Sequence, residues 1–98
     1  MSYVAISKVK FPISLKEKIT NVGLEMIPIA KKQPGFISVH FHISTEENET
    51  MMYWEWGSKS DHEGCMESED WASMMGKSNS LFQSVGIEFS IQTYERLA

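Results

Sequence analysis

The segment PGFISVHFHISTEENETMMYWEWGSK, residues Pro34 to Lys59, decides the fold of this chain. Its Pro-Gly start is a turn signal, after which apolar residues alternate through residues 36–44. A second run, residues 50–56, is rich in aromatic and other strand-favouring side chains. Residues 45–49 between the runs are charged and include a turn-forming asparagine. The segment therefore predicts a β-hairpin.

Two registers of this hairpin are open, and they differ in where they place two histidines. If Thr45 pairs with Thr50, the histidines lie on the face opposite the tryptophans. If Ser44 pairs with Thr50, the histidines and tryptophans share one face. The first register separates polar from apolar side chains better and is preferred. The side chains concerned are His40, His42, Trp54 and Trp56.

A strand and a helix precede the hairpin. Residues 3–11 alternate as a strand does. Ser14 and Glu17 have the spacing of a capping box, which predicts a helix start. Pro28 removes one backbone hydrogen bond inside that helix, so a bend is expected before its end at Gln33. The apolar stripe of this helix comprises Leu15, Ile19, Val22, Met26, Ile29 and Ala30.

Two helices and a strand follow the hairpin. Ser58 and Ser60 are alternative N-caps of a short helix, and Ser68 caps a longer one. Gly86 ends the longer helix, and residues 87–94 alternate as a last strand. The apolar stripe of the longer helix comprises Trp71, Met75, Ser78, Phe82 and Val85.

The element order is thus β-α-β-β-α-α-β. Because such crossovers are right-handed, this order predicts an α+β fold with a ferredoxin-like four-stranded antiparallel sheet and the helices on one face. Residues 1–98 are expected to form a single domain.

Composition narrows the classes of function. The net charge is −4 and the chain has one arginine, which argues against a nucleic-acid partner. A hydrophobic content of 42% is generous for 98 residues and points to self-association. No apolar run is long enough to span a membrane. With Cys65 as its one cysteine and no leader pattern, the chain is expected in the reducing cytoplasm, with Cys65 packed as a small hydrophobic residue.

The element order, the IPIAKKQPGF stretch before residue 37 and the passage YWEWGSKSDHEGCMESEDW resemble the antibiotic biosynthesis monooxygenase family. The resemblance implies a homodimeric α+β barrel, in which two such sheets face each other. It also implies oxidation of a small aromatic quinol or polycyclic phenol by oxygen, with no metal or flavin cofactor. Trp56 matches a tryptophan that commonly ends the third strand of the family. Met52 stands where polyketide-oxidising members have an asparagine.

A branch of the family degrades heme, using an Asn, a Trp and a His. This chain has Ile6 or Ser7, Cys65 and Met75 at the corresponding places. The resemblance therefore favours the phenol-oxidising branch over heme degradation.

The candidate substrate-binding residues are aromatic. In the preferred register Trp54 and Trp56 point under the helices, where Trp71 and His62 can close a cavity for a flat ring. Ordinary core packing is the alternative, because each buried tryptophan removes about 150–250 Å² from water. A histidine near the ring can act as a base toward a phenol, but no catalytic residue is assigned.

His40 and His42 form an H-x-H pair that can chelate a metal if Glu55 supplies a third ligand. No further ligand completes such a site in the sequence, so no metal is assigned. The leading interpretation is a cofactor-independent monooxygenase. The alternatives are a homodimer that binds a small molecule without catalysis and a structural protein without a pocket.

Overall fold

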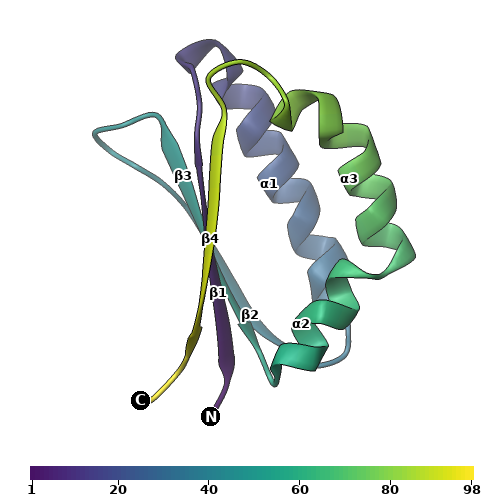
Figure 1. Cartoon of the computed structure of the whole chain (residues 1–98). Coiled ribbons are helices and arrows are strands. Elements are labelled where there is room, and N and C mark those ends of the chain that lie inside the picture. The colour runs from purple at the N-terminus through teal and green to yellow at the C-terminus, as the bar shows by residue number, and fades with distance from the viewer.

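A computed structural model describes all residues of the chain, 1–98. It has two layers, a four-stranded sheet and three α-helices that cover one face of it (Figure 1). The strands are β1 (Tyr3–Lys10), β2 (Phe36–Ile43), β3 (Glu49–Trp56) and β4 (Glu88–Glu95). The helices are the short 3₁₀ turn η1 (Ile13–Leu15), α1 (Lys16–Lys31), α2 (Lys59–Met66) and α3 (Glu69–Phe82). None of the helices is long and apolar enough to cross a membrane.

The sheet has the strand order β2-β3-β1-β4, and every neighbouring pair is antiparallel. This arrangement confirms the predicted ferredoxin-like α+β fold. The sheet face turned away from the helices, called the open face below, carries no helix (Figure 1). β1 and β3 lie in the centre, so the residues that they direct toward the helices lie in the middle of the core.

The hairpin keeps the preferred assignment of faces but not the predicted pairing. Ile43, rather than Thr45, lies opposite Thr50, so the register differs by two residues. The Ser44 hydroxyl accepts hydrogen bonds from the backbone N–H groups of Glu46 and Glu47, and this local turn ends β2 early. Since a shift of two residues preserves side-chain alternation, the histidines stay on the open face and the tryptophans face the helices.

Of the candidate helix caps, Ser58 and Ser68 form, whereas the alternative Ser60 lies inside α2 and the cap at Ser14 does not form. Ser58 accepts from the Asp61 backbone N–H, and Ser68 accepts from that of Trp71. The capping box predicted at Ser14 is wrong, because this residue lies in η1 and α1 has no side-chain cap. The Leu15 N–H instead donates to the Pro12 carbonyl at 2.9 Å, which tightens the chain into a 3₁₀ turn.

α1 and α3 also differ from the sequence prediction at their ends. α1 continues through Pro28 but ends at Lys31 rather than Gln33. α3 ends at Phe82, so Val85 lies beyond the helix and is 95% exposed. Its predicted place on the apolar stripe is therefore wrong.

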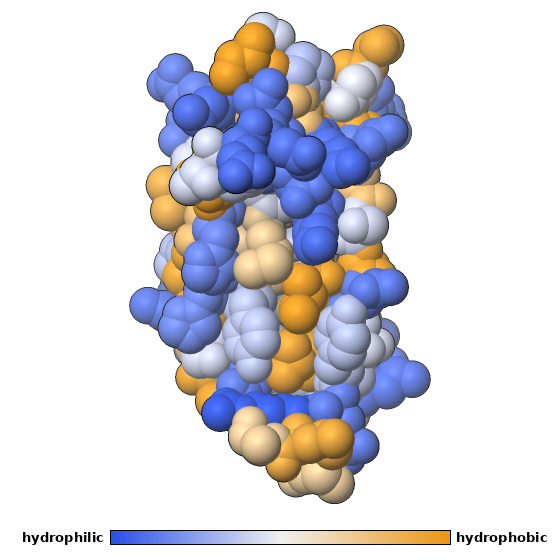
Figure 2. All heavy atoms as spheres, turned by 90° about the vertical axis from the view of Figure 1, so that its left-hand side faces the viewer, coloured by the Kyte–Doolittle hydropathy of each residue, from blue (hydrophilic) through white to orange (hydrophobic).

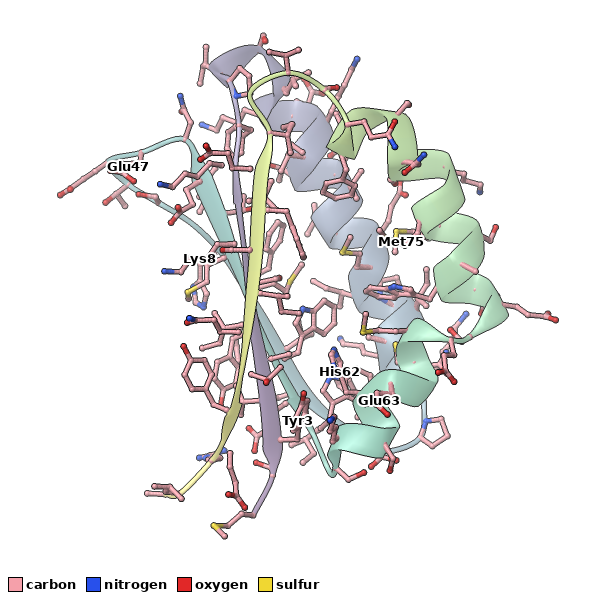
Figure 3. All side chains as sticks on the ribbon, viewed as in Figure 1. Tyr3, Lys8, Glu47, His62, Glu63 and Met75 are labelled. Atoms are coloured by element: carbon pink, nitrogen blue, oxygen red, sulfur yellow. The ribbon has the colours of Figure 1, made fainter.

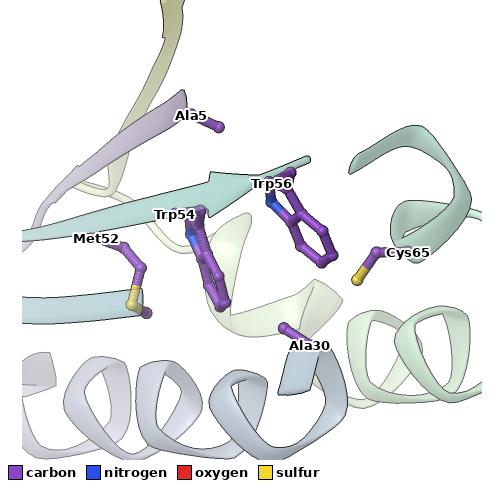
Figure 4. Close-up of a cluster of buried hydrophobic side chains, with 6 residues drawn as sticks. All are labelled: Ala5, Ala30, Met52, Trp54, Trp56 and Cys65. Atoms are coloured by element: carbon purple, nitrogen blue, oxygen red, sulfur yellow. The ribbon is translucent and has the colours of Figure 1, made fainter. Parts of the chain in front are cut away.

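The core lies between β1, β3 and the helices. Trp56 is its largest fully buried side chain, with 1% of its surface exposed. Figure 4 shows both tryptophans of β3 projecting from the strand toward the helices. The buried cluster comprises Ala5, Ala30, Met52, Trp54, Trp56 and Cys65.

Candidate functional site

A cavity of about 200 Å³ lies between the sheet and the helices. Its walls are almost wholly apolar, and only Ser7 and His62 contribute polar side chains apart from indole N–H groups and a thiol. The lining residues are Ser7, Met26, Trp54, Trp56, His62, Cys65, Met66, Trp71, Met75, Phe89 and Ile91. An apolar cavity with few polar groups is typical of a small-molecule site.

All four residues singled out from the sequence line this cavity. Trp54 and Trp71 meet edge to face, with ring centroids 6.1 Å apart and planes at 77°. The His62 ring lies 5.9 Å from that of Trp56. β3, α2 and α3 thus each contribute aromatic walls to one chamber, which a flat ring can enter with favourable edge-to-face contacts.

The tryptophans of β3 belong to the core and to the cavity wall at once. Trp54 and Trp56 are buried, whereas Trp71 is half-buried. The indole Nε1–H of Trp56 is buried and has no hydrogen-bond acceptor in the protein. A buried donor without a partner is costly, so an acceptor that reached this N–H would be bound favourably.

His62 lies at the end of the cavity where β1 begins. Its ring centroid is 5.5 Å from that of Tyr3, and Figure 3 shows the two side chains together between α2 and the sheet. Burial lowers the pKa of His62 below its ordinary value of 6.5, and the Glu63 carboxylate opposes this by favouring the charged form. The imidazole is therefore neutral at pH 7 and able to accept a proton.

Cys65 has the structural role that the sequence predicted. It is 2% exposed and belongs to the buried cluster. Burial raises the pKa of its thiol to about 11, so it is protonated at neutral pH and is not a nucleophile.

The H-x-H pair lies outside this cavity. His40 and His42 pair with Tyr53 and Met51 on the open face. They do not form a group with Glu55 that could hold a metal ion. The metal-chelating alternative for these residues therefore has no support in the structure.

Glu55 is bound instead by residues from the two ends of the chain. Its carboxylate accepts a hydrogen bond from the Ser2 hydroxyl and two from Arg96 Nη1, at 2.9 and 3.1 Å. The Ser2 hydrogen bond is the main cause that lowers the pKa of Glu55; burial opposes it, and Arg96 reinforces it. This contact joins the N-terminus, β3 and the residues after β4.

Sequence reasoning missed the part of the cavity that other elements supply. The additional residues come from β1, α1, α2, α3 and β4: Ser7, Met26, Cys65, Met66, Met75, Phe89 and Ile91. Alternation in residues 87–94 places Phe89 and Ile91 on the same face of the last strand. In the structure this face is turned toward the helices, because the two residues pair with Val9 and Ser7 of β1. No local signal shows that α3 leaves these two side chains uncovered.

The fold is shared by several solved structures. A conserved protein from Methanosarcina mazei Go1 aligns with a TM-score of 0.84 at 15% identity, covering 99% of this chain and 94% of its own. A candidate antibiotic biosynthesis monooxygenase from Nitrosomonas europaea aligns with a TM-score of 0.82 at 12% identity, covering 98% and 90%. SnoaB, a cofactor-independent oxygenase from Streptomyces nogalater, aligns with a TM-score of 0.78 at 7% identity, covering 99% and 94%.

These similarities establish the ferredoxin-like α+β fold of the single chain. No protein-family model matches the chain, and no curated protein matches it.

Proposed function

We propose that this protein is a cofactor-independent monooxygenase that oxidises a small aromatic phenol or quinol in the cytoplasm. The observation that carries the proposal is the aromatic cavity of about 200 Å³ with one imidazole, that of His62, in its wall. The shared fold with the oxygenase SnoaB supports the class of reaction.

His62 is the proposed general base. Its pKa is lowered by burial, so at neutral pH it can take the proton from a phenolic hydroxyl that enters the cavity. The resulting phenolate is more easily oxidised by dioxygen than the phenol. For a quinol, one oxygen atom enters the ring and the other leaves as water, giving a hydroxyquinone. The quinol supplies all the electrons, so the reaction needs no external reductant.

The size of the cavity limits the substrate. An apolar cavity of about 150 Å³ is large enough to hold benzene, and drug-sized ligands occupy pockets of about 300–1,000 Å³. A cavity of about 200 Å³ therefore suits one ring or two fused rings. It does not favour the heme-degrading alternative, because a porphyrin is much larger.

Oxygen consumption with one-ring and two-ring quinols tests the proposal. The wild type should consume oxygen well above the rate of quinol autoxidation, and His62→Gln should lose most of that excess. His42→Gln is the matched control, because His42 is an exposed histidine on the open face. No excess over autoxidation, or an undiminished excess in His62→Gln, would refute the proposal.

We also propose that the protein is a homodimer joined through the open face. Figure 2 shows that apolar and weakly polar side chains run down the middle of this face between hydrophilic ones. The side chains that contribute to it include Ile6, Met51 and Tyr53 of the two central strands. Light scattering on a sizing column should give twice 11.2 kDa, and Ile6→Lys should give the monomer. Leu24→Lys, on exposed α1 surface, should remain dimeric.

A homodimer that binds the aromatic ligand without consuming it is the second candidate. The observation that favours it is that His62 makes no side-chain hydrogen bond to a carboxylate that would orient it as a base. In that case aromatic ligands raise the melting temperature and are recovered unchanged.

A further inference from the structure

The cavity has an apolar rim, defined here as its four lining side chains that are also exposed: Met66, Met75, Phe89 and Ile91. Their exposed fractions are 48%, 36%, 58% and 44%. They come from α2, α3 and β4. Figure 3 places Met75 on the α3 side of the space between that helix and the sheet.

The rim arises from how the helices cover the sheet. α3 packs mainly on α1, and α2 contacts β3, so neither helix is closely packed on the edge strand β4. Phe89 and Ile91 lie on the helix-facing side of β4, because they pair with Val9 and Ser7 of β1. Both side chains therefore face the helix layer, but no helix covers them. The Phe89 ring lies 6.4 Å from that of Phe82, the last residue of α3.

The chamber and the rim together define two subsites. The chamber walls are buried and half-buried aromatic rings, whereas the rim is continuous with the chamber and offers mainly thioether and alkyl surface. Methionine side chains adapt to flexible apolar partners. Exposed apolar side chains continuous with a ligand cavity mark surface that a ligand can bury.

We propose that the ligand of this site is a phenol or quinol ring that carries an apolar chain, with the ring in the chamber and the chain on the rim. This inference rests on the proposed function and names its substrate more narrowly. The whole cavity, rim included, measures about 200 Å³, so a chain of several carbons extends beyond it between β4 and the two helices.

A homologous series of 4-alkylphenols, from phenol to 4-heptylphenol, tests the inference by quenching of tryptophan fluorescence. A fully buried methylene tightens binding about fourfold, and one on a half-exposed rim about twofold. The dissociation constant should therefore fall about twofold per methylene and then level off once the chain passes the rim.

Variants separate the rim from general hydrophobicity. In Phe89→Ser/Ile91→Ser the decrease in the dissociation constant per added methylene should largely disappear. Val85→Ser, which removes an exposed apolar side chain remote from the cavity lining, should keep the wild-type series. Circular dichroism shows whether the double variant is folded, and Met75→Gln gives a milder test if it is not.

Each outcome decides between the two proposals. If phenol binds but the dissociation constant does not depend on chain length, or depends on it equally in the double variant, the rim proposal is wrong and the proposed function stands. If no phenol binds, both are wrong. If the rim variants change the oligomeric state but not the dependence of the dissociation constant on chain length, a second copy of the chain covers the rim. The rim proposal is then overturned.

Discussion

The imidazole of His62 lies against the indole of Trp56, with ring centroids 5.9 Å apart and planes inclined at 48°. This contact joins a titratable group on α2 to the most buried aromatic side chain of the sheet. It places an imidazole that burial keeps neutral at pH 7 against the apolar wall of the cavity.

The pH dependence of oxygen consumption should follow the neutral form of His62. Because burial lowers its pKa below 6.5, the rate should be nearly constant above pH 7 and fall as the pH drops below 6.5. Glu63→Gln removes the charge that raises this pKa, so the midpoint should move to lower pH. If the midpoint of the pH–rate curve stays the same in Glu63→Gln and is also present in His62→Gln, the titration belongs to another group.

Glu55 should stabilise the protein at neutral pH and lose this effect in acid. Its folded-state pKa lies below the ordinary value of 4.5, so its contribution is complete above pH 4.5 and disappears as the pH falls through the folded-state value. Glu55→Gln should therefore unfold at lower urea concentration than wild type at pH 7, with a smaller difference in acid. Glu47→Gln, in the exposed turn, serves as the control. Equal differences at both pH values would contradict this role.

Two glycines should respond in opposite ways to alanine. Gly35 has φ 82°, and a Cβ there would clash with the Asp61 side chain, so Gly35→Ala should lower the free energy of unfolding by about 1–3 kcal/mol. Gly76 lies within α3 and a Cβ there meets nothing within 4 Å. Gly76→Ala should raise the free energy by about 0.5–1 kcal/mol. Urea unfolding curves measure both changes in the free energy of unfolding. Two changes of the same sign would contradict this packing.

Cys65 should resist alkylation in the native state. Its thiol is buried and its pKa is about 11, so little thiolate exists at pH 8. Iodoacetamide should label the native protein far more slowly than the protein in urea, as mass spectrometry can follow. Comparable rates in both states would show that α2 does not shield this residue.

Local patterns were enough to predict most of the fold. The hairpin, the Ser68 cap, one of the two alternative caps at Ser58 and Ser60, and the ferredoxin-like sheet follow from alternation, capping and the handedness of crossovers. The cap predicted at Ser14 does not form, because the Leu15 N–H donates to the Pro12 carbonyl and the chain makes a 3₁₀ turn there. The pairing of the hairpin failed because Ser44 closes its own turn.

The candidate site was only partly predictable, for a physical reason. Trp54, Trp56, Trp71 and His62 were found because aromatic residues at strand and helix spacing indicate their own faces. The contact of Glu55 with Arg96 and Ser2 joins residues 41 and 53 positions apart, and no local pattern encodes it. The single arginine, placed after the last strand, was the one available hint. The rim depends on where α3 packs, which no local pattern encodes either.

The most direct test of the proposed site is a crystal structure of the protein with a brominated naphthol, with bromine located by its anomalous signal. One bromine site is expected in or at the mouth of the cavity, with the naphthol ring between Trp54, Trp71 and His62. Bromine only on the open face, near Glu55 and Arg96, or no ordered bromine at a saturating concentration, would contradict the proposed site.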